Sequence, residues 1–127
     1  MKMKEQDLFE ALKENYIQDL VKNDNEFGTF DCSTERFKTH IELKCRKWHY
    51  EQQVIEKGKY DRLSNIPGKV KYIVSDPTGV FSYDLKNLPE PTWEKRSMPQ
   101  TSEFNCREFV MKEVGYWNYG QGKIIDL

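Results

Sequence analysis

The chain has 127 residues, of which 32% are charged, 37% are hydrophobic and 13% are aromatic, and its formal net charge is −1. This length predicts one domain, residues 1–127, with a modest core. No apolar run approaches the roughly 20 residues that span a membrane, and the polar start predicts no secretory signal. Three cysteines are an odd number, so we expect reduced core cysteines in a cytoplasmic (intracellular) protein.

The charges are spread unevenly along the chain. Residues 44–71 carry eight Lys and Arg against three Asp and Glu, whereas the segments on both sides are acidic on balance. A basic block beside acidic segments suits a protein that holds cations with its carboxylates and receives phosphates with its lysines and arginines. Ordinary local variation also produces blocks of this size, so the distribution supports that interpretation without deciding it.

Residues 5–22 have the periodicity of an amphipathic helix. Leu8, Leu12 and Tyr16 recur at a spacing that places them on one side. Glu5 falls on the same stripe, where a carboxylate needs a partner. Alternatively, Glu5 lies in a frayed first turn, where its charge suits the helix dipole.

Two stretches with a period of two follow, at 27–33 and 37–47, joined by a turn at 33–36. Such alternation is typical of strands with one face in a core. In the second stretch, apolar or small residues alternate with polar ones, namely Thr39, Ile41, Leu43 and Cys45 with His40, Glu42, Lys44 and Arg46.

If these strands pair, Asp31, Glu42 and Lys44 converge on one polar patch. Two adjacent carboxylates bind a hard divalent cation, and a neighbouring lysine can hold an attacking water or a phosphate. His40 shares this face and could transfer a proton or contact phosphate. A solvated strand face with an ion pair remains the alternative.

Asp31, an eleven-residue step and then Glu42-x-Lys44 on a strand resembles the PD-(D/E)XK nuclease superfamily, which includes restriction endonucleases and small Holliday-junction resolvases. Phe30 stands where the motif has proline. The resemblance covers about residues 5–86 and implies an α/β fold with a restriction-endonuclease-like core, in which an N-terminal helix joins a central mixed β-sheet flanked by helices. Residues 87–127 match no motif.

The resemblance also implies roles for individual residues. Asp31, Glu42 and the Leu43 carbonyl would bind Mg²⁺ or Mn²⁺, Lys44 would orient or deprotonate the attacking water, and Glu5 would complete the metal site. No organic cofactor is expected.

The segment after residue 47 has no clean period. We expect an irregular or short helical piece at 50–56 and a helix at 57–65, with Gln53, Lys57 and Lys59 as candidates to contact the site. Strands are predicted at 69–75 and 79–85, because β-forming residues flank the strong turn signal of residues 76–79.

The remaining third is predicted from weaker signals. Prolines indicate a loop at 86–103, and 104–117 reads as a short helix or strand followed by an edge element. Residues 118–122 look flexible, and Ile124 and Ile125 would dock on the body or on a second subunit. A second Asp-x-Lys, at Asp84 and Lys86, lies at the far end of an outer strand.

These observations predict a metal-dependent endonuclease that hydrolyses DNA phosphodiester bonds with structure selectivity or weak sequence specificity. Cations following the motif would grip flanking phosphates, namely Arg46, Lys47, Lys57 and Lys59. A homodimer is plausible, because cutting two strands needs two sites. The alternatives are a catalytically silent protein of the same fold that binds nucleic acid or protein, and a small structural or inhibitory factor of viral type.

Overall fold

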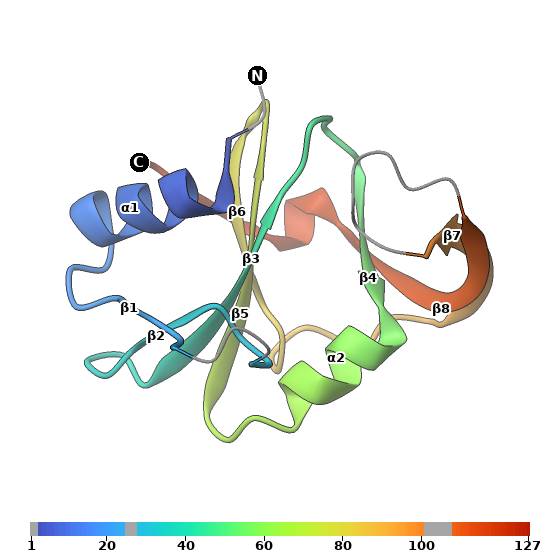
Figure 1. Cartoon of the computed structure of the whole chain (residues 1–127), viewed down its shortest axis with the longest axis horizontal. Coiled ribbons are helices and arrows are strands. Elements are labelled where there is room, and N and C mark those ends of the chain that lie inside the picture. The colour runs from blue at the N-terminus through green and yellow to red at the C-terminus, as the bar shows by residue number, and fades with distance from the viewer. Residues whose placement is uncertain (1–2, 25–27, 101–107) are drawn as a thin grey trace.

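The computed structural model describes residues 3–24, 28–100 and 108–127. Within these residues the fold is mixed α/β, as predicted, with two α-helices and two sheets (Figure 1). The helices are α1 (Glu5–Asn15) and α2 (Lys57–Ser64). No helix in the described residues is long and apolar enough to cross a membrane.

The larger sheet has six strands in the order β1-β2-β3-β5-β6-β9. β3 and β5 are parallel and the other neighbours are antiparallel, so the sheet is mixed. Its strands are β1 (Val21–Lys22), β2 (Cys32–Thr34), β3 (Thr39–Cys45), β5 (Lys69–Asp76), β6 (Gly79–Asp84) and β9 (Lys123–Ile125).

The smaller sheet has three antiparallel strands in the order β4-β8-β7. They are β4 (Gln52–Glu56), β8 (Phe109–Asn118) and β7 (Glu94–Pro99), and the 3-10 helix η1 (Tyr119–Gln121) leads from β8 to β9. Figure 1 shows α1 on one side of the six-stranded sheet, and α2 with the smaller sheet on the other.

Each face of the six-stranded sheet has its own core. Under α1 the core is mostly aliphatic, and Leu8 and Leu12 of the helix pack with Ile41, Leu43 and Ile73 of the strands. The opposite core joins the sheet to α2 and β8, and it is rich in large aromatic side chains, namely Tyr60, Tyr72, Phe81, Tyr83 and Trp117. The alternation predicted for β3 is confirmed, because its odd-numbered residues Thr39, Ile41 and Leu43 are buried and its even-numbered ones are half-buried.

The first helix is shorter than the predicted 5–22. It ends at Asn15, and Tyr16, expected on the apolar stripe, is 38% exposed. The Lys13 ammonium donates to the carbonyls of Gln18 and Leu20, at 3.0 and 2.7 Å, which stabilises a non-helical turn there. Leu20 therefore reaches the core from an irregular segment.

The predictions for the two strands of the motif and for the hairpin after α2 were largely right. The strand predicted at 27–33 is β2, which begins later, and residues 25–27 lie outside the described part. The helix at 57–65 and the hairpin at 69–85 are confirmed. In the hairpin turn, Gly79 has the positive φ of 150° that the turn signal indicated.

Three predictions outside that region were wrong. Residues 50–56 contain β4 and no helix. The strand was not predicted because one of its two buried positions is Gln53, and a polar residue facing inward hides the period of two that Gln53 and Ile55 share. The predicted loop at 86–103 contains β7, whose side chains are mostly exposed and carry no apolar alternation. The tail expected to be flexible at 118–122 forms η1, and the docking of Ile125 on the body is confirmed by its pairing with β6.

Candidate functional site

The site begins at Asp31, which directly precedes β2 in the chain and lies beside the edge of β3. The Asp31 N–H donates to the Ile41 carbonyl at 2.9 Å, and the Leu43 N–H donates to Asp31 Oδ2 at 2.7 Å. Asp31 therefore continues the pairing of β2 with its side chain, which fixes the carboxylate against the strand. Since the N–H and C=O of one strand residue point to the same side, the Leu43 carbonyl lies on this edge as well.

Glu42 approaches Asp31 from the sheet face that α2 covers. Its side chain is only 12% exposed, and its Oε2 lies 3.0 Å from Lys59 Nζ in α2. Burial raises the pKa of Glu42 to about 7, and the Asp31 charge and a side-chain hydrogen bond with Asp31 add to this, whereas Lys59 opposes it. Burial lowers the pKa of Lys59, but Glu42 outweighs it, so that pKa is raised overall.

Glu5 approaches the same aspartate from the first turn of α1, on the other side of the sheet. Partial burial raises its pKa to about 7, and a side-chain hydrogen bond and charge repulsion from Asp31 contribute. Asp31 thus stands between two carboxyl groups that titrate near neutrality. The interpretation of Glu5 as a site residue fits this geometry better than a frayed first turn does.

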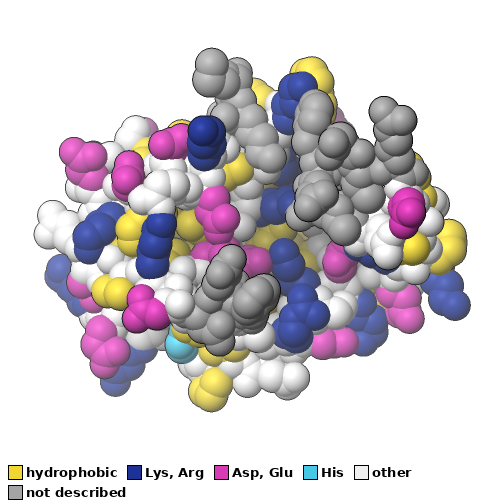
Figure 2. Space-filling view, viewed as in Figure 1, with side chains coloured by type: hydrophobic (Ala, Val, Ile, Leu, Met, Phe, Trp, Pro, Cys, Tyr) yellow, Lys and Arg dark blue, Asp and Glu magenta, His cyan; other side chains and the backbone are white. Residues whose placement is uncertain are grey.

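The three acids border one open hollow of about 620 Å³, which Leu43, Lys44 and Lys59 also line. Figure 2 shows acidic and basic side chains gathered together near the middle of this face. Among the residues that the structure describes, no group of three or more His, Cys, Asp and Glu side chains is placed to hold a metal ion as it stands. A cation here would draw on fewer carboxylates, together with the Leu43 carbonyl and water, which is common for Mg²⁺.

The structure separates the predicted phosphate-contacting cations into two groups. Arg46 and Lys59 lie with Lys44 around a pocket next to the acids. Lys57 pairs with Asp61 at 2.8 Å on the outer side of α2, and Lys47 lies over the Trp48 ring at 5.4 Å. Neither Lys47 nor Lys57 lines the hollow or that pocket.

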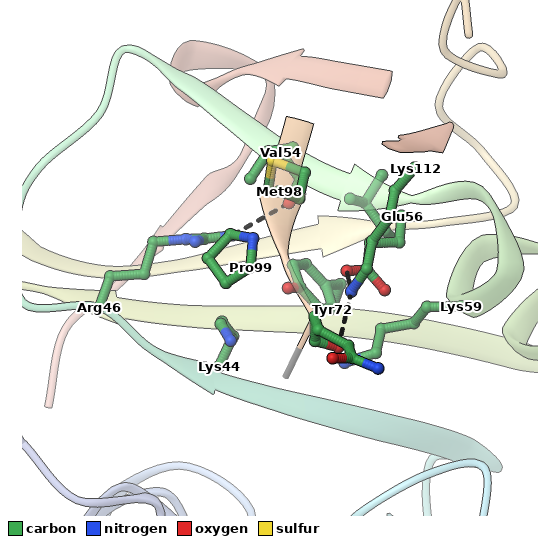
Figure 3. Close-up of a pocket in the computed structure, with 11 residues that line it drawn as sticks. Lys44, Arg46, Val54, Glu56, Lys59, Tyr72, Met98, Pro99 and Lys112 are labelled. Carbon is green, nitrogen blue, oxygen red and sulfur yellow. Dashed lines mark hydrogen bonds and ion pairs between the residues drawn. The ribbon is translucent and has the colours of Figure 1, made fainter. Parts of the chain in front are cut away.

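Arg46 is half-buried and is held by two hydrogen bonds. Its Nε donates to Gln53 Oε1 and its terminal nitrogen to the Val54 carbonyl, both at 2.9 Å. These bonds tie the end of β3 to β4 and fix the guanidinium beside the pocket (Figure 3). The candidate Gln53 is itself fully buried and acts by holding Arg46.

Sequence reasoning missed the contribution of β8. Lys112 lines the same pocket, donates to Glu56 Oε1 at 2.8 Å and to the Gln100 carbonyl at 3.3 Å. Only the pairing of β8 with β4 brings Lys112 to the site, and no pattern in residues 104–117 indicates it.

Two other candidates have local roles. His40 packs edge-on against the Phe30 ring, with centroids 4.6 Å apart, and its buried Nδ1 has no hydrogen-bond partner among the described residues. In the second Asp-x-Lys, the Lys86 ammonium donates to the Ile66 carbonyl and Asp84 accepts from Asn87. Asp76, which would complete that motif, is bonded to Thr78 and His49. The prediction that Asp76 belongs to the turn is confirmed.

Comparison of the chain with protein-family models, with curated proteins and with solved structures found no match. The functional argument therefore depends on the arrangement of these side chains.

Proposed function

We propose that this protein is a metal-dependent endonuclease that hydrolyses DNA phosphodiester bonds, built on a restriction-endonuclease-like core of α1, the β2–β3 edge, β5 and α2. The observation that supports this most directly is the position of Asp31. Its carboxylate lies between those of Glu5 and Glu42, in a hollow that Lys4, Lys44 and Lys59 also line. Acids so arranged repel one another unless a proton or a cation lies between them.

The donors suit Mg²⁺ or Mn²⁺. Both cations prefer oxygen ligands, and Asp31, Glu42 and the Leu43 carbonyl supply them from one edge, with Glu5 within reach of Asp31. When bound, such a cation lowers the pKa of a water molecule and offsets charge on the scissile phosphate. The pKa values of Glu5 and Glu42, both raised to about 7, mean that protons partly offset the negative charge of the acids at neutral pH when no cation is bound.

The lysines then have distinct tasks. Lys44 follows Glu42 by two residues on the same face of β3, so its ammonium borders the hollow and can orient the attacking water or a phosphate oxygen. Lys59 neutralises Glu42 and lines both the hollow and the adjoining pocket. A cation held by Glu42 would replace Lys59 as its partner, and Lys59 could then contact phosphate.

The test is cleavage of supercoiled plasmid and of branched DNA with Mg²⁺ or Mn²⁺. Lys44→Ala should lower the rate by about 100-fold or more, the size expected for a group that moves or orients a proton. Lys86→Ala is the matched control, since it removes the lysine of the second Asp-x-Lys and should cut like the wild type.

One outcome would reject the enzyme and another would reject the proposed site. Binding of DNA by wild type and Lys44→Ala, with no cutting by either, would support a catalytically silent binding protein. Equal loss in Lys86→Ala and Lys44→Ala would show that the Glu42-x-Lys44 strand has no special role.

A further inference from the structure

Beside the acidic hollow lies a second pocket, between the six-stranded sheet and the three-stranded sheet (Figure 3). Its volume is about 400 Å³, within the range of sites that enclose a small molecule or one unit of a polymer. A DNA duplex is far wider than such a space. Whatever enters it is therefore a single unit of a strand or a free small ligand.

The pocket is cationic. Among the described residues that line it, four are cations, namely Lys44, Arg46, Lys59 and Lys112, and one is an acid, Glu56, so positive charge is in excess. Three of these cations have protein partners that hold them: Gln53 for Arg46, Glu42 for Lys59, and Glu56 with the Gln100 carbonyl for Lys112. Fixed cations at a partly enclosed site favour an anion with several oxygens, such as a phosphate.

One wall is apolar. Figure 3 shows Val54, Met98 and Pro99 gathered on one side of the pocket, across from Lys44 and Lys59. An apolar wall facing lysines suits a ligand with a flat apolar part and an anionic part, and a nucleotide has both. Every base has an apolar face that such a wall can contact, so this contact tolerates any sequence.

The pocket is continuous with the acidic hollow through Lys44 and Lys59, which line both. We propose that it holds one nucleotide unit of an unpaired DNA strand, directly beside the phosphate to be cut, with the base against Val54, Met98 and Pro99. This inference rests on the proposed function and narrows its substrate to DNA with a single-stranded or splayed segment.

The experiment measures binding without cleavage. Fluorescence anisotropy in EDTA compares a labelled single strand with its duplex. Single-strand binding should be clearly tighter. Lys112→Ala should weaken it about tenfold, the loss of one charge-assisted bond to phosphate, and Val54→Phe, which fills the pocket, should weaken it too.

Glu56→Gln should change the affinity for single-stranded DNA in the opposite direction. Removing the one acid among the described residues that line the pocket should tighten single-strand binding several-fold, a gain that misfolding does not produce. Lys95→Ala is the matched control, since Lys95 lies on β7 of the same sheet, outside this pocket, and should change nothing.

Unlabelled dTMP and inorganic phosphate then serve as competitors. dTMP should displace the strand at lower concentration than phosphate does. Equal competition would show that the apolar wall takes no base and would overturn the nucleotide assignment. Equal affinity for duplex and single strand would contradict the proposal that the pocket binds an unpaired nucleotide. An affinity unchanged by both Lys112→Ala and Glu56→Gln would contradict it as well.

The two proposals fail separately. If the protein binds single strands as described yet cuts no DNA, the single-strand site is supported and the nuclease activity is rejected. If the protein cuts DNA but substitutions in the pocket do not change its affinity for single strands, the nuclease activity is supported and the single-strand site is rejected.

Discussion

The two faces of the six-stranded sheet are built differently. The face under α1 is covered by leucines spaced along one helix, and its strand residues come from β2, β3, β5, β6 and β9 of the one sheet. The face under α2 and β8 is aromatic, and its members come from residues 55 to 117. The first face needs only one helix on a single sheet, whereas the second requires the two sheets to meet.

Trp117 is the centre of that second face. It is 1% exposed, stacks on Tyr83 with ring centroids 5.5 Å apart, and lies 6.1 Å from Tyr72. The cationic pocket lies between the same two sheets, and Tyr72 lines it. The binding surface thus depends on the aromatic face, and the acids depend on the edge of β3.

The largest expected effect is the loss of folding stability when one large side chain is removed from either face of the sheet. Trp117→Ala should cost about 3–5 kcal/mol and Leu12→Ala about 2–5 kcal/mol, measured by urea unfolding. Near-UV circular dichroism should fall much more in Trp117→Ala, because the aromatic contacts are lost. Similar spectra for the two variants would show that the faces are not independent.

A smaller expected effect is a pH dependence of stability that comes from the acids and not from the cationic pocket. Burial holds the pKa of Glu42 at about 7, against an ordinary value of 4.5, so the folded protein binds this proton more tightly than the unfolded chain. The resulting stability is complete below pH 4.5 and is lost as pH rises through about 7, a change on the order of 2 kcal/mol in EDTA. Denaturant unfolding at several pH values measures it.

Glu42→Gln is the control for that prediction and should reduce the pH dependence to the part that Glu5, whose pKa is also raised to about 7, contributes. Adding Mg²⁺ at pH 8 should restore stability, by about 2.7 kcal/mol at 100 times the dissociation constant. A wild-type protein whose stability rises from pH 4.5 to 7 in EDTA would contradict the assignment.

The smallest effect concerns Lys59, which links the two sites. At pH 8, Lys59→Met should bind Mn²⁺ about tenfold more tightly in calorimetry, because the lysine no longer competes for Glu42. Lys57→Met, two residues away on the outer side of α2, should match the wild type. Weaker Mn²⁺ binding in Lys59→Met would mean that Lys59 supports the cation and does not replace it.

Much of the acidic site follows from local pattern. The period of two in β3 predicts that Glu42 and Lys44 share a face, and the helical spacing of α1 predicts that Glu5 lies near its buried stripe. Asp31 lies within eleven residues of Glu42, so one strand pairing brings them together. The cytoplasmic location, the metal, the DNA substrate and the homodimer remain predictions.

The pocket could not be predicted in the same way. Gln53 hides the period of β4, since a buried glutamine satisfied by Arg46 and the Tyr50 carbonyl looks like a surface residue in the sequence. β7 exposes nearly all its side chains, so its hydrogen bonds to β8 are the only reason it is a strand. Lys112 reaches Glu56 across 56 positions of the chain.

By itself, the amino-acid order determined which residues alternate along β3 and which face of α1 is apolar, because both depend on backbone geometry repeated every few residues. Only the tertiary structure decided that Lys59 pairs with Glu42 and that Lys112, Arg46 and Met98 enclose one pocket. Those contacts join segments whose separation in the chain carries no information about distance, and they exist because two sheets bury a shared aromatic core.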